Sequence, residues 1–326
     1  MKHFTRIGAA VALLIGLAGG AHAADTASKV EAVASFSILG DMVREVGGDR
    51  IAVTTLVGPD GDTHVFSPTP ADAKALASAK LFFVNGLGFE GWMDRLVKAS
   101  DFKGDVVVTS DGITPRHLAS GEGHDHGEKD HADHAKASGE DDDDDEEEEE
   151  EETDPHAWQS LANGKVYVGN IRDALIEADP EGRATYEANA ARYLDAIGKE
   201  KQAVKEAVAK LPPERRRIIT SHDAFHYFGE AYGLKVIAPE GVSTESEASA
   251  KDVAKIIRQI KQEKIPAVFL ENVTDRRLLD QIARETGAKI GGTLYSDALS
   301  PPGGPAPTYL DMFGHNIGAL TAALSS

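Results

Sequence analysis

The chain has 326 residues, a formal net charge of -20 at pH 7 and no cysteine. Residues 140–152 are consecutive carboxylates and carry much of that charge, so the rest is mildly acidic. An acidic surface repels nucleic-acid backbones and anionic lipids, which argues against binding to either, and it is compatible with attracting cations. Without cysteine there are no disulfides, no thiolate metal sites and no lipid-modified cysteine.

The first 23 residues have the pattern of a secretory signal peptide. The positively charged Lys2 and Arg6 precede an apolar run over 7–18, and Ala21-His22-Ala23 provides a small-x-small cleavage site. The apolar run is shorter than the about 20 residues needed to span a bilayer. We therefore expect a mature chain from residue 24 that is soluble in the periplasm and has no lipid anchor.

From residue 30 onward, short β-branched runs alternate with amphipathic stretches, which is the pattern of an α/β fold. The first series predicts strands at 30–35, 51–57, 81–85 and 105–109 and helices at 38–46, 71–79 and 90–99. The second predicts strands at 217–221, 235–238, 267–271 and 289–291 and helices at 224–232, 250–263, 275–286 and 308–324. About 300 residues exceed what one core usually organises, so we predict two similar α/β lobes.

A long helix at 181–211 is predicted to link a first lobe at 24–180 to a second lobe at 212–326. From Tyr186 to Leu211 the apolar residues recur every three, four or seven positions and share one helix face, and Pro212-Pro213 ends the helix. The alternative is an ordinary surface helix. A rigid strut would limit hinge closure, so release of a ligand would depend on local loop motion.

Residues 117–153 are expected to form a disordered loop of the first lobe, since they contain no large apolar side chain after Leu118. A flexible segment loses chain entropy when it wraps an ion, so any metal sites in it should be weak. Two interpretations remain open: a collecting arm for metal, and a solubilising insertion that binds metal incidentally. Its five histidines are His117, His124, His126, His131 and His134.

Four other residues lie at predicted strand ends or turns. His64 follows the strand at 51–57, His222 follows the strand at 217–221, Asp297 follows the last strand, and His156 lies in an Asp-Pro-His-Ala-Trp segment. Ligands of open α/β sheets bind where strands end at their carboxyl side. One such histidine alone would be read as an ordinary hydrogen-bonded residue, but three with a carboxylate favour a metal site.

His222 and His226 are four residues apart and superficially resemble the His-Glu-x-x-His of zinc proteases. Asp223 stands in place of the glutamate and is too short to reach a metal-bound water in the same way. We therefore expect His226 to be a supporting or packing residue, and we expect the same of His315.

The motifs around the four residues resemble those of ZnuA/TroA-like solute-binding proteins of ABC importers. They occur in the family's order: His64 with the following Ser-Pro-Thr-Pro, Asp154-Pro155-His156-Ala157-Trp158, Ser221-His222-Asp223-Ala224-Phe225 and Leu294-Tyr295-Ser296-Asp297. The resemblance implies one metal in a cleft, held by His64 and His156 from the first lobe and by His222 and Asp297 from the second. Thr63 stands where relatives often have Pro or Glu, which leaves Asp297 as the expected fourth ligand.

The resemblance implies capture of Zn(II) in the periplasm and delivery to an ABC permease and its ATPase, with a metallochaperone as a further possible partner. Family members that carry manganese or iron typically have Glu at the position of His222, and manganese prefers more oxygen ligands. Four protein ligands leave no open position for an activated water, so we expect a binding protein and no enzyme. We also expect a monomer. The alternatives are a manganese or iron subunit of the same importer class, a secreted zinc-dependent hydrolase, and a metal-buffering or adhesive protein.

Overall fold

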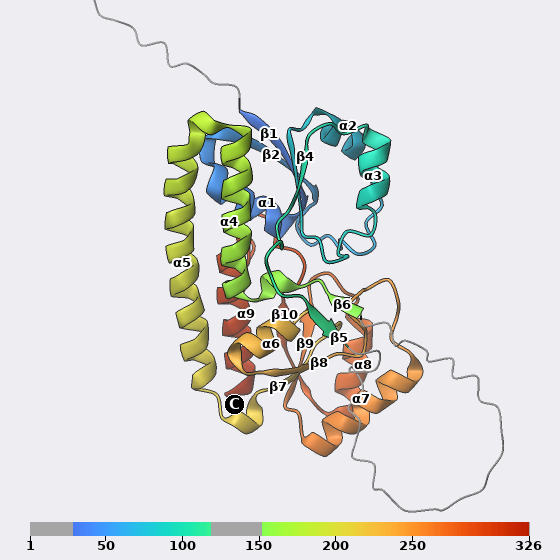
Figure 1. The fold of residues 1–326 in the computed structure, drawn as a ribbon. Helices are drawn as coiled ribbons and strands as arrows, with labels where there is room; N and C mark the ends of the chain where they lie inside the picture. The colour runs from blue at the N-terminus through green and yellow to red at the C-terminus, as the bar shows by residue number, and fades with distance from the viewer. Residues whose placement is uncertain (1–28, 119–151, 326) are drawn as a thin grey trace, which may run out of the picture.

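The computed structural model describes residues 29–118 and 152–325. The predicted signal peptide and the loop histidines at 124, 126, 131 and 134 lie outside the described residues. The described chain forms two α/β lobes, each built on a parallel four-stranded sheet, which confirms the predicted fold class (Figure 1). Among these residues, no helix is long and apolar enough to cross a membrane.

The sheet of the first lobe has the strand order β2-β1-β3-β4, and all its pairings are parallel. In Figure 1, α1 and α4 cover one face of this sheet and α2 and α3 the other. The strands are β1 (Val30–Phe36), β2 (Ile51–Val57), β3 (Leu81–Val84) and β4 (Asp105–Val108). The helices are α1 (Ser37–Gly47), α2 (Pro70–Ser78), α3 (Met93–Ser100) and α4 (Leu161–Ala178), with short 3-10 turns η1 (Gly48–Arg50), η2 (Ala157–Gln159) and η3 (Pro180–Gly182).

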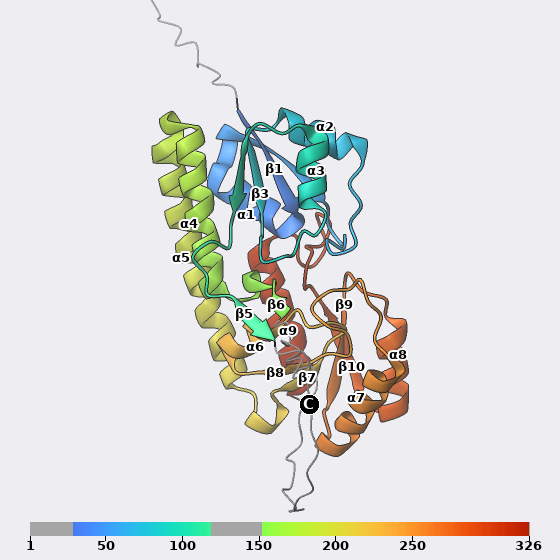
Figure 2. The ribbon, with the colours of Figure 1, turned by 45° about the vertical axis from the view of Figure 1, so that its right-hand side comes forward.

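The sheet of the second lobe has the order β10-β9-β7-β8 and is also parallel. Its strands are β7 (Arg217–Ile219), β8 (Lys235–Ile237), β9 (Ala267–Glu271) and β10 (Lys289–Leu294). Its helices are α6 (His226–Tyr232), α7 (Ala250–Glu263), α8 (Arg277–Thr286) and α9 (Tyr309–Leu324), preceded by η4 (Pro213–Arg215). In both lobes the carboxyl ends of the strands lead into loops between the sheets (Figures 1 and 2).

Helix α5 (Arg183–Ala209) runs along both lobes (Figure 2). Its buried residues include Tyr186, Tyr193, Ile197 and Val208, which is the face predicted from their spacing. This face packs against α1 and α4 of the first lobe and against α9 of the second. The helix therefore supports both lobes. The predicted domain boundaries at 180/181 and 211/212 stay a prediction.

Several elements differ from the sequence prediction. Helix α4 was not predicted, because Asn163, Gly164, Gly169 and Asn170 dilute its helical signal. Helix α3 begins at Met93 instead of residue 90, because the Glu90 carboxylate accepts hydrogen bonds from the backbone N–H groups of Asn85 and Gly86.

The prediction of a disordered loop over 117–153 is wrong at its two ends. Strands β5 (Arg116–Leu118) and β6 (Glu152–Asp154) pair antiparallel, with His117 opposite Thr153. The Oγ1 atom of Thr153 lies 3.2 Å from Nδ1 of His117. Backbone pairing between residues far apart in sequence orders these ends, and composition alone does not reveal it.

We expect the substitution Ile197→Ala to destabilise the metal-free protein by about 2–5 kcal/mol, because Ile197 is fully buried at the middle of α5. Lys205→Ala, at an exposed position of the same helix, should change stability by less than about 0.5 kcal/mol. Urea unfolding of both variants measures this difference. Equal stability of the two variants would contradict the supporting role of α5.

Candidate metal centre

The four residues predicted as ligands come together between the two sheets. His64 lies in the loop after β2, His222 in the turn after β7 and Asp297 in the turn after β10, while His156 directly precedes η2. Each offers one donor atom, and these atoms all lie within 4.8 Å of one another. Three of the four therefore lie where parallel strands end, as the topology of α/β sheets favours.

The distances around the Asp297 carboxylate fit a small ion. Its Oδ2 atom lies 3.1 Å from Nε2 of His222 and 3.5 Å from Nε2 of His64, and its Oδ1 atom lies 3.6 Å from Nε2 of His156. A tetrahedral ion with bonds of about 2.1 Å keeps its donor atoms about 3.4 Å apart. The arrangement thus needs little change to surround such an ion.

Buried polar atoms at this point lack hydrogen-bond partners. Among the described residues, these atoms include Nε2 of His64, Nε2 of His156 and Oδ1 of Asp297. A buried polar atom without a partner is costly, so the convergence of three of them requires an explanation. A bound cation supplies one, because it would accept the lone pairs of all three atoms.

Two further carboxylates orient the histidines. Asp154 Oδ1 lies 2.8 Å from Nδ1 of His156 and also accepts its backbone N–H. Glu271 Oε2 lies 2.7 Å from Nδ1 of His222, and its Oε1 accepts the backbone N–H groups of Ser221 and His222. A carboxylate on Nδ1 leaves Nε2 to face the metal.

The role of Glu271 was not predicted from the sequence. Its signal is a carboxylate at the end of the wholly buried strand β9, where a charge must have a partner. Asp154 was noticed only as part of a motif. Glu271 is 49 residues from His222, so no local pattern links the two. Asp154 belongs to the same motif as His156, and the motif alone does not show that its carboxylate contacts the imidazole.

Burial and charge set the protonation of the centre. Burial by itself lowers the pKa of His156, but Asp297 and Asp154 outweigh it and raise that pKa to about 9. Burial also lowers the pKa of His222, and Glu271 and Asp297 raise it well above its ordinary value. Burial raises the pKa of Asp297, yet His222 and His156 hold it well below the usual range. Without a bound ion, the protonated forms of His156 and His222 and the charged form of Asp297 are therefore favoured.

The other histidines within 29–118 and 152–325 lie outside this cluster. His226 begins α6, with Nδ1 3.8 Å from Asp154 Oδ2 and Nε2 3.7 Å from Asp223 Oδ1. The predicted helix at 224–232 thus starts later than expected, and His222 lies in the turn before it, so the two histidines do not share a helix face as in His-Glu-x-x-His. His315, on α9, contacts the backbone carbonyl of Thr293 on β10, and His117 is exposed on β5.

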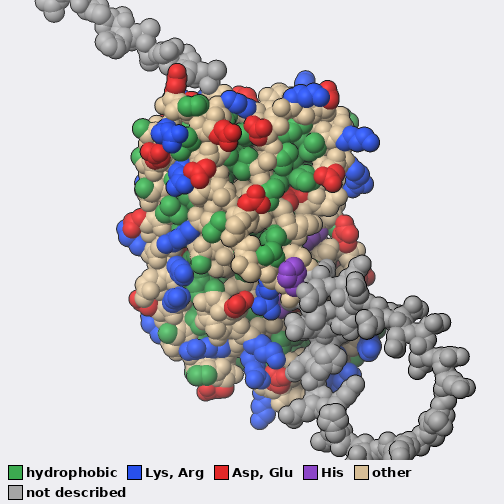
Figure 3. All heavy atoms as spheres, in the orientation of Figure 1, with side chains coloured by type: hydrophobic (Ala, Val, Ile, Leu, Met, Phe, Trp, Pro, Cys, Tyr) green, Lys and Arg blue, Asp and Glu red, His purple; other side chains and the backbone are tan. Residues whose placement is uncertain are grey.

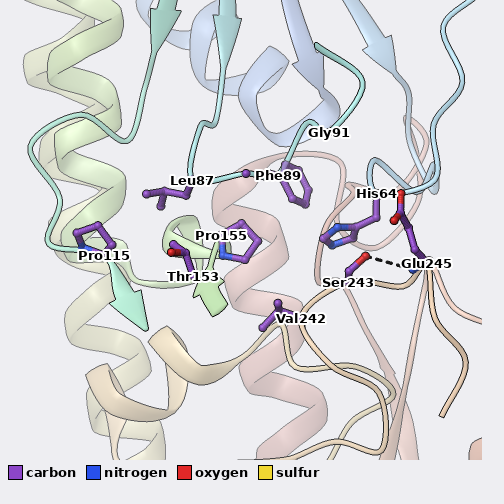
Figure 4. Close-up of a pocket in the computed structure, with 11 residues that line it drawn as sticks. His64, Leu87, Phe89, Gly91, Pro115, Thr153, Pro155, Val242, Ser243 and Glu245 are labelled. Atoms are coloured by element: carbon purple, nitrogen blue, oxygen red, sulfur yellow. Dashed lines mark hydrogen bonds between the residues drawn. The ribbon is translucent and has the colours of Figure 1, made fainter. Parts of the chain in front are cut away.

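Of the four residues of the centre, only His64 is partly exposed in the part of the chain that the structure describes. His64 is 9% exposed, whereas His156, His222 and Asp297 are completely buried. His64 lines a cavity of about 550 Å³ together with Phe89, Pro155, Val242 and Glu245 (Figure 4). Histidine side chains also reach the surface near the junction of the lobes (Figure 3). Solvent and ions thus reach the centre past His64.

Comparison with known proteins places this geometry in a family. Residues 32–323 match the family model ZnuA, described as zinc-uptake complex component A, periplasmic. The chain is 33% identical to the manganese-binding lipoprotein MntA of Halalkalibacterium halodurans, over 95% of each chain. It is 32% identical to the iron-binding protein YfeA of Yersinia pestis, over 91% of this chain and 86% of that protein.

Solved structures give the same result. The Mn-bound periplasmic metal binding protein from Candidatus Liberibacter asiaticus is 31% identical, with a TM-score of 0.74 over 90% of this chain and 98% of that one. The periplasmic zinc binding protein TroA from Treponema pallidum is 28% identical, with a TM-score of 0.77 over 91% and 99%. The chain therefore belongs to the ZnuA family of metal-binding substrate-binding proteins of ABC transporters.

Proposed function

We propose that this protein captures Zn(II) in the periplasm and delivers it to an ABC permease and its ATPase. The observation that carries the proposal is the set of three imidazole nitrogens and one carboxylate around a single point. This donor set suits four-coordinate zinc. The zinc-binding TroA and the zinc-uptake description of the family support the same metal.

Manganese and iron are the competing cargoes, because MntA is named manganese-binding and YfeA iron-binding. Between zinc and manganese, His222 favours zinc. Manganese prefers oxygen donors and more than four of them, and here a nitrogen donor stands at a fully buried position. The neighbouring Glu271 supports His222 through Nδ1, so its carboxylate is engaged as a partner of the imidazole.

Binding without catalysis is part of the proposal. Four protein donors fill the positions around a tetrahedral ion and leave none for an activated water. We propose that the protein is free in the periplasm, since the chain contains no cysteine to carry a lipid, although MntA is a lipoprotein. We also propose that it is a monomer. The histidines at 117, 124, 126, 131 and 134 would bind further zinc weakly, and a metallochaperone could load the centre.

Metal preference tests the proposal most directly. The parent protein should bind Zn(II) more tightly than Mn(II), and His222→Glu should raise the affinity for Mn(II) relative to Zn(II) at least about tenfold, because it adds a hard oxygen donor and a negative charge. His226→Glu should leave this ratio nearly unchanged. Competition titrations with a chromogenic chelator measure both. A parent protein that prefers Mn(II), or variants that behave alike, would contradict zinc as the cargo.

The carboxylate behind His222 provides a second test. Glu271→Gln removes the charge that holds Nδ1 of His222, so zinc affinity should fall about 10–100-fold while the four donors stay in place. Glu263→Gln is the matched control, because that carboxylate pairs with Arg217 on the surface of α7. Calorimetric titration of both variants gives the affinities. Equal affinities would mean that Glu271 does not orient the ligand.

Zinc affinity should also depend on pH. In the metal-free protein the pKa of His156 is raised from its ordinary value of about 6.5 to about 9. Protonation of His156 therefore stabilises the fold fully below about pH 6.5, and this contribution is lost as the pH rises through about 9. Zinc must displace this proton, so its apparent affinity should rise about tenfold per pH unit between pH 6 and 8.5 for each proton displaced. An affinity that is flat over this range would exclude the histidines as the main donors.

A further inference from the structure

The segment 238–249, between β8 and α7, covers the exposed side of the metal centre. It contains no helix or strand, and its Val242 is buried beside the cavity that reaches His64. Figure 4 shows Val242, Ser243 and Glu245 on the second-lobe side of this cavity, across from Leu87 and Phe89 of the first lobe. The segment thus forms one wall of the path by which an ion reaches His64.

The base of this segment is attached to both neighbours of His222. The backbone N–H of Asp223 donates to the Gly241 carbonyl at 3.0 Å, and the N–H of Glu240 donates to the Ser221 carbonyl at 3.4 Å. These bonds lie within the second lobe. They fix the start of the segment next to the metal centre, while its middle must be held by something else.

The middle of the segment is held by the first lobe through Asp62. The Thr244 hydroxyl donates to Asp62 Oδ2 at 2.7 Å, and the other oxygen, Oδ1, accepts the backbone N–H of His64 at 2.9 Å. One carboxylate therefore joins the segment of the second lobe to a metal ligand of the first. Movement of Thr244 would reach His64 through this single side chain.

The contact between Asp62 and Thr244 has open space on both sides. Val242, Ser243 and Glu245 line the cavity of about 550 Å³ beside His64. Asp62, Glu240 and Thr244 line a second cavity of about 540 Å³. The segment is the wall between the two, so little packing opposes its displacement once the hydrogen bond is broken.

The opposite side of the His64 loop has separate attachments. The Asn272 side chain donates to Asp60 Oδ1 at 3.0 Å and to the Ala298 carbonyl at 3.2 Å, and the N–H of Asp60 donates to the Leu299 carbonyl at 2.9 Å. These bonds tie the loop to the turn that carries Asp297. They would remain if the contact with Thr244 broke, so His64 would stay near Asp297 while the wall opened.

We propose that the hydrogen bond between Asp62 and Thr244 is a latch that closes segment 238–249 over His64 and sets the rate of metal exchange, with Asp62 as a positioning residue for His64. This inference rests on the proposed metal-binding role of the four-residue cluster. Because the closed segment obstructs the same path for entry and for exit, breaking the latch should speed both.

Zinc exchange in paired variants tests the latch. In Thr244→Val, which keeps the shape and removes the hydroxyl, the rates of zinc binding and of zinc release to excess chelator should both rise about tenfold, as expected from loss of one hydrogen bond to a charged group. The dissociation constant should change less than about threefold. Thr244→Ser restores the hydroxyl and should restore slow exchange. Stopped-flow measurements on the full chain give both rates.

Further variants separate the latch from a structural effect. Asp62→Ala should speed exchange and also weaken affinity, because the N–H of His64 loses its acceptor, whereas Asp62→Asn keeps a partner for both groups and should recover most of the parent behaviour. Thr321→Val, on α9 away from the centre, is the matched control. Unchanged exchange rates in Thr244→Val, or a change only in its thermal unfolding, would overturn the latch. Zinc binding that survives Asp297→Ala would instead overturn the metal centre itself.

Discussion

The buried charge of Asp297 is the constraint on which the rest of this structure depends. A fully buried carboxylate is costly unless opposite charge and hydrogen bonds surround it. Here three imidazoles face it, and two of them, His156 and His222, have raised pKa values because Asp154, Glu271 and Asp297 lie close to them. A divalent ion brings as much positive charge as two protonated imidazoles. Exchange of protons for metal therefore leaves the charge of the buried centre nearly constant.

The metal centre is held more firmly on the side of His156 than on the side of His64. On the side of His156, the Trp158 and Gln159 side chains both donate to the Ser296 carbonyl, next to Asp297, at 3.0 Å and 2.7 Å. The N–H of Tyr309 at the start of α9 donates to the buried Asp41 at 2.9 Å. Together with α5, which packs on both lobes, these contacts make a rigid back. The side of His64 faces a cavity and a segment without regular structure, so exchange of metal by local motion fits this architecture better than wide opening of the lobes.

Proteins named for different metals share this fold. Proteins named for manganese, iron and zinc all resemble this chain over most of its length. The shared fold supplies a place where loops from two sheets meet, so the fold alone does not distinguish one ion from another. His222, in the turn after β7, pairs with Glu271 at the end of a different strand, β9.

The sequence by itself determined the two α/β series, helix 250–263 to the residue, the apolar face of the linking helix and the four candidate ligands. These features are local: periodicity selects strands and helices, and a strand's end places the next residue at the sheet edge. Only the tertiary structure decided that the four donor atoms lie within 4.8 Å, that Glu271 supports His222 and that Asp62 meets Thr244. Thr244 is 182 residues from Asp62, and no local pattern encodes such a partner, because packing of the two lobes alone brings them together.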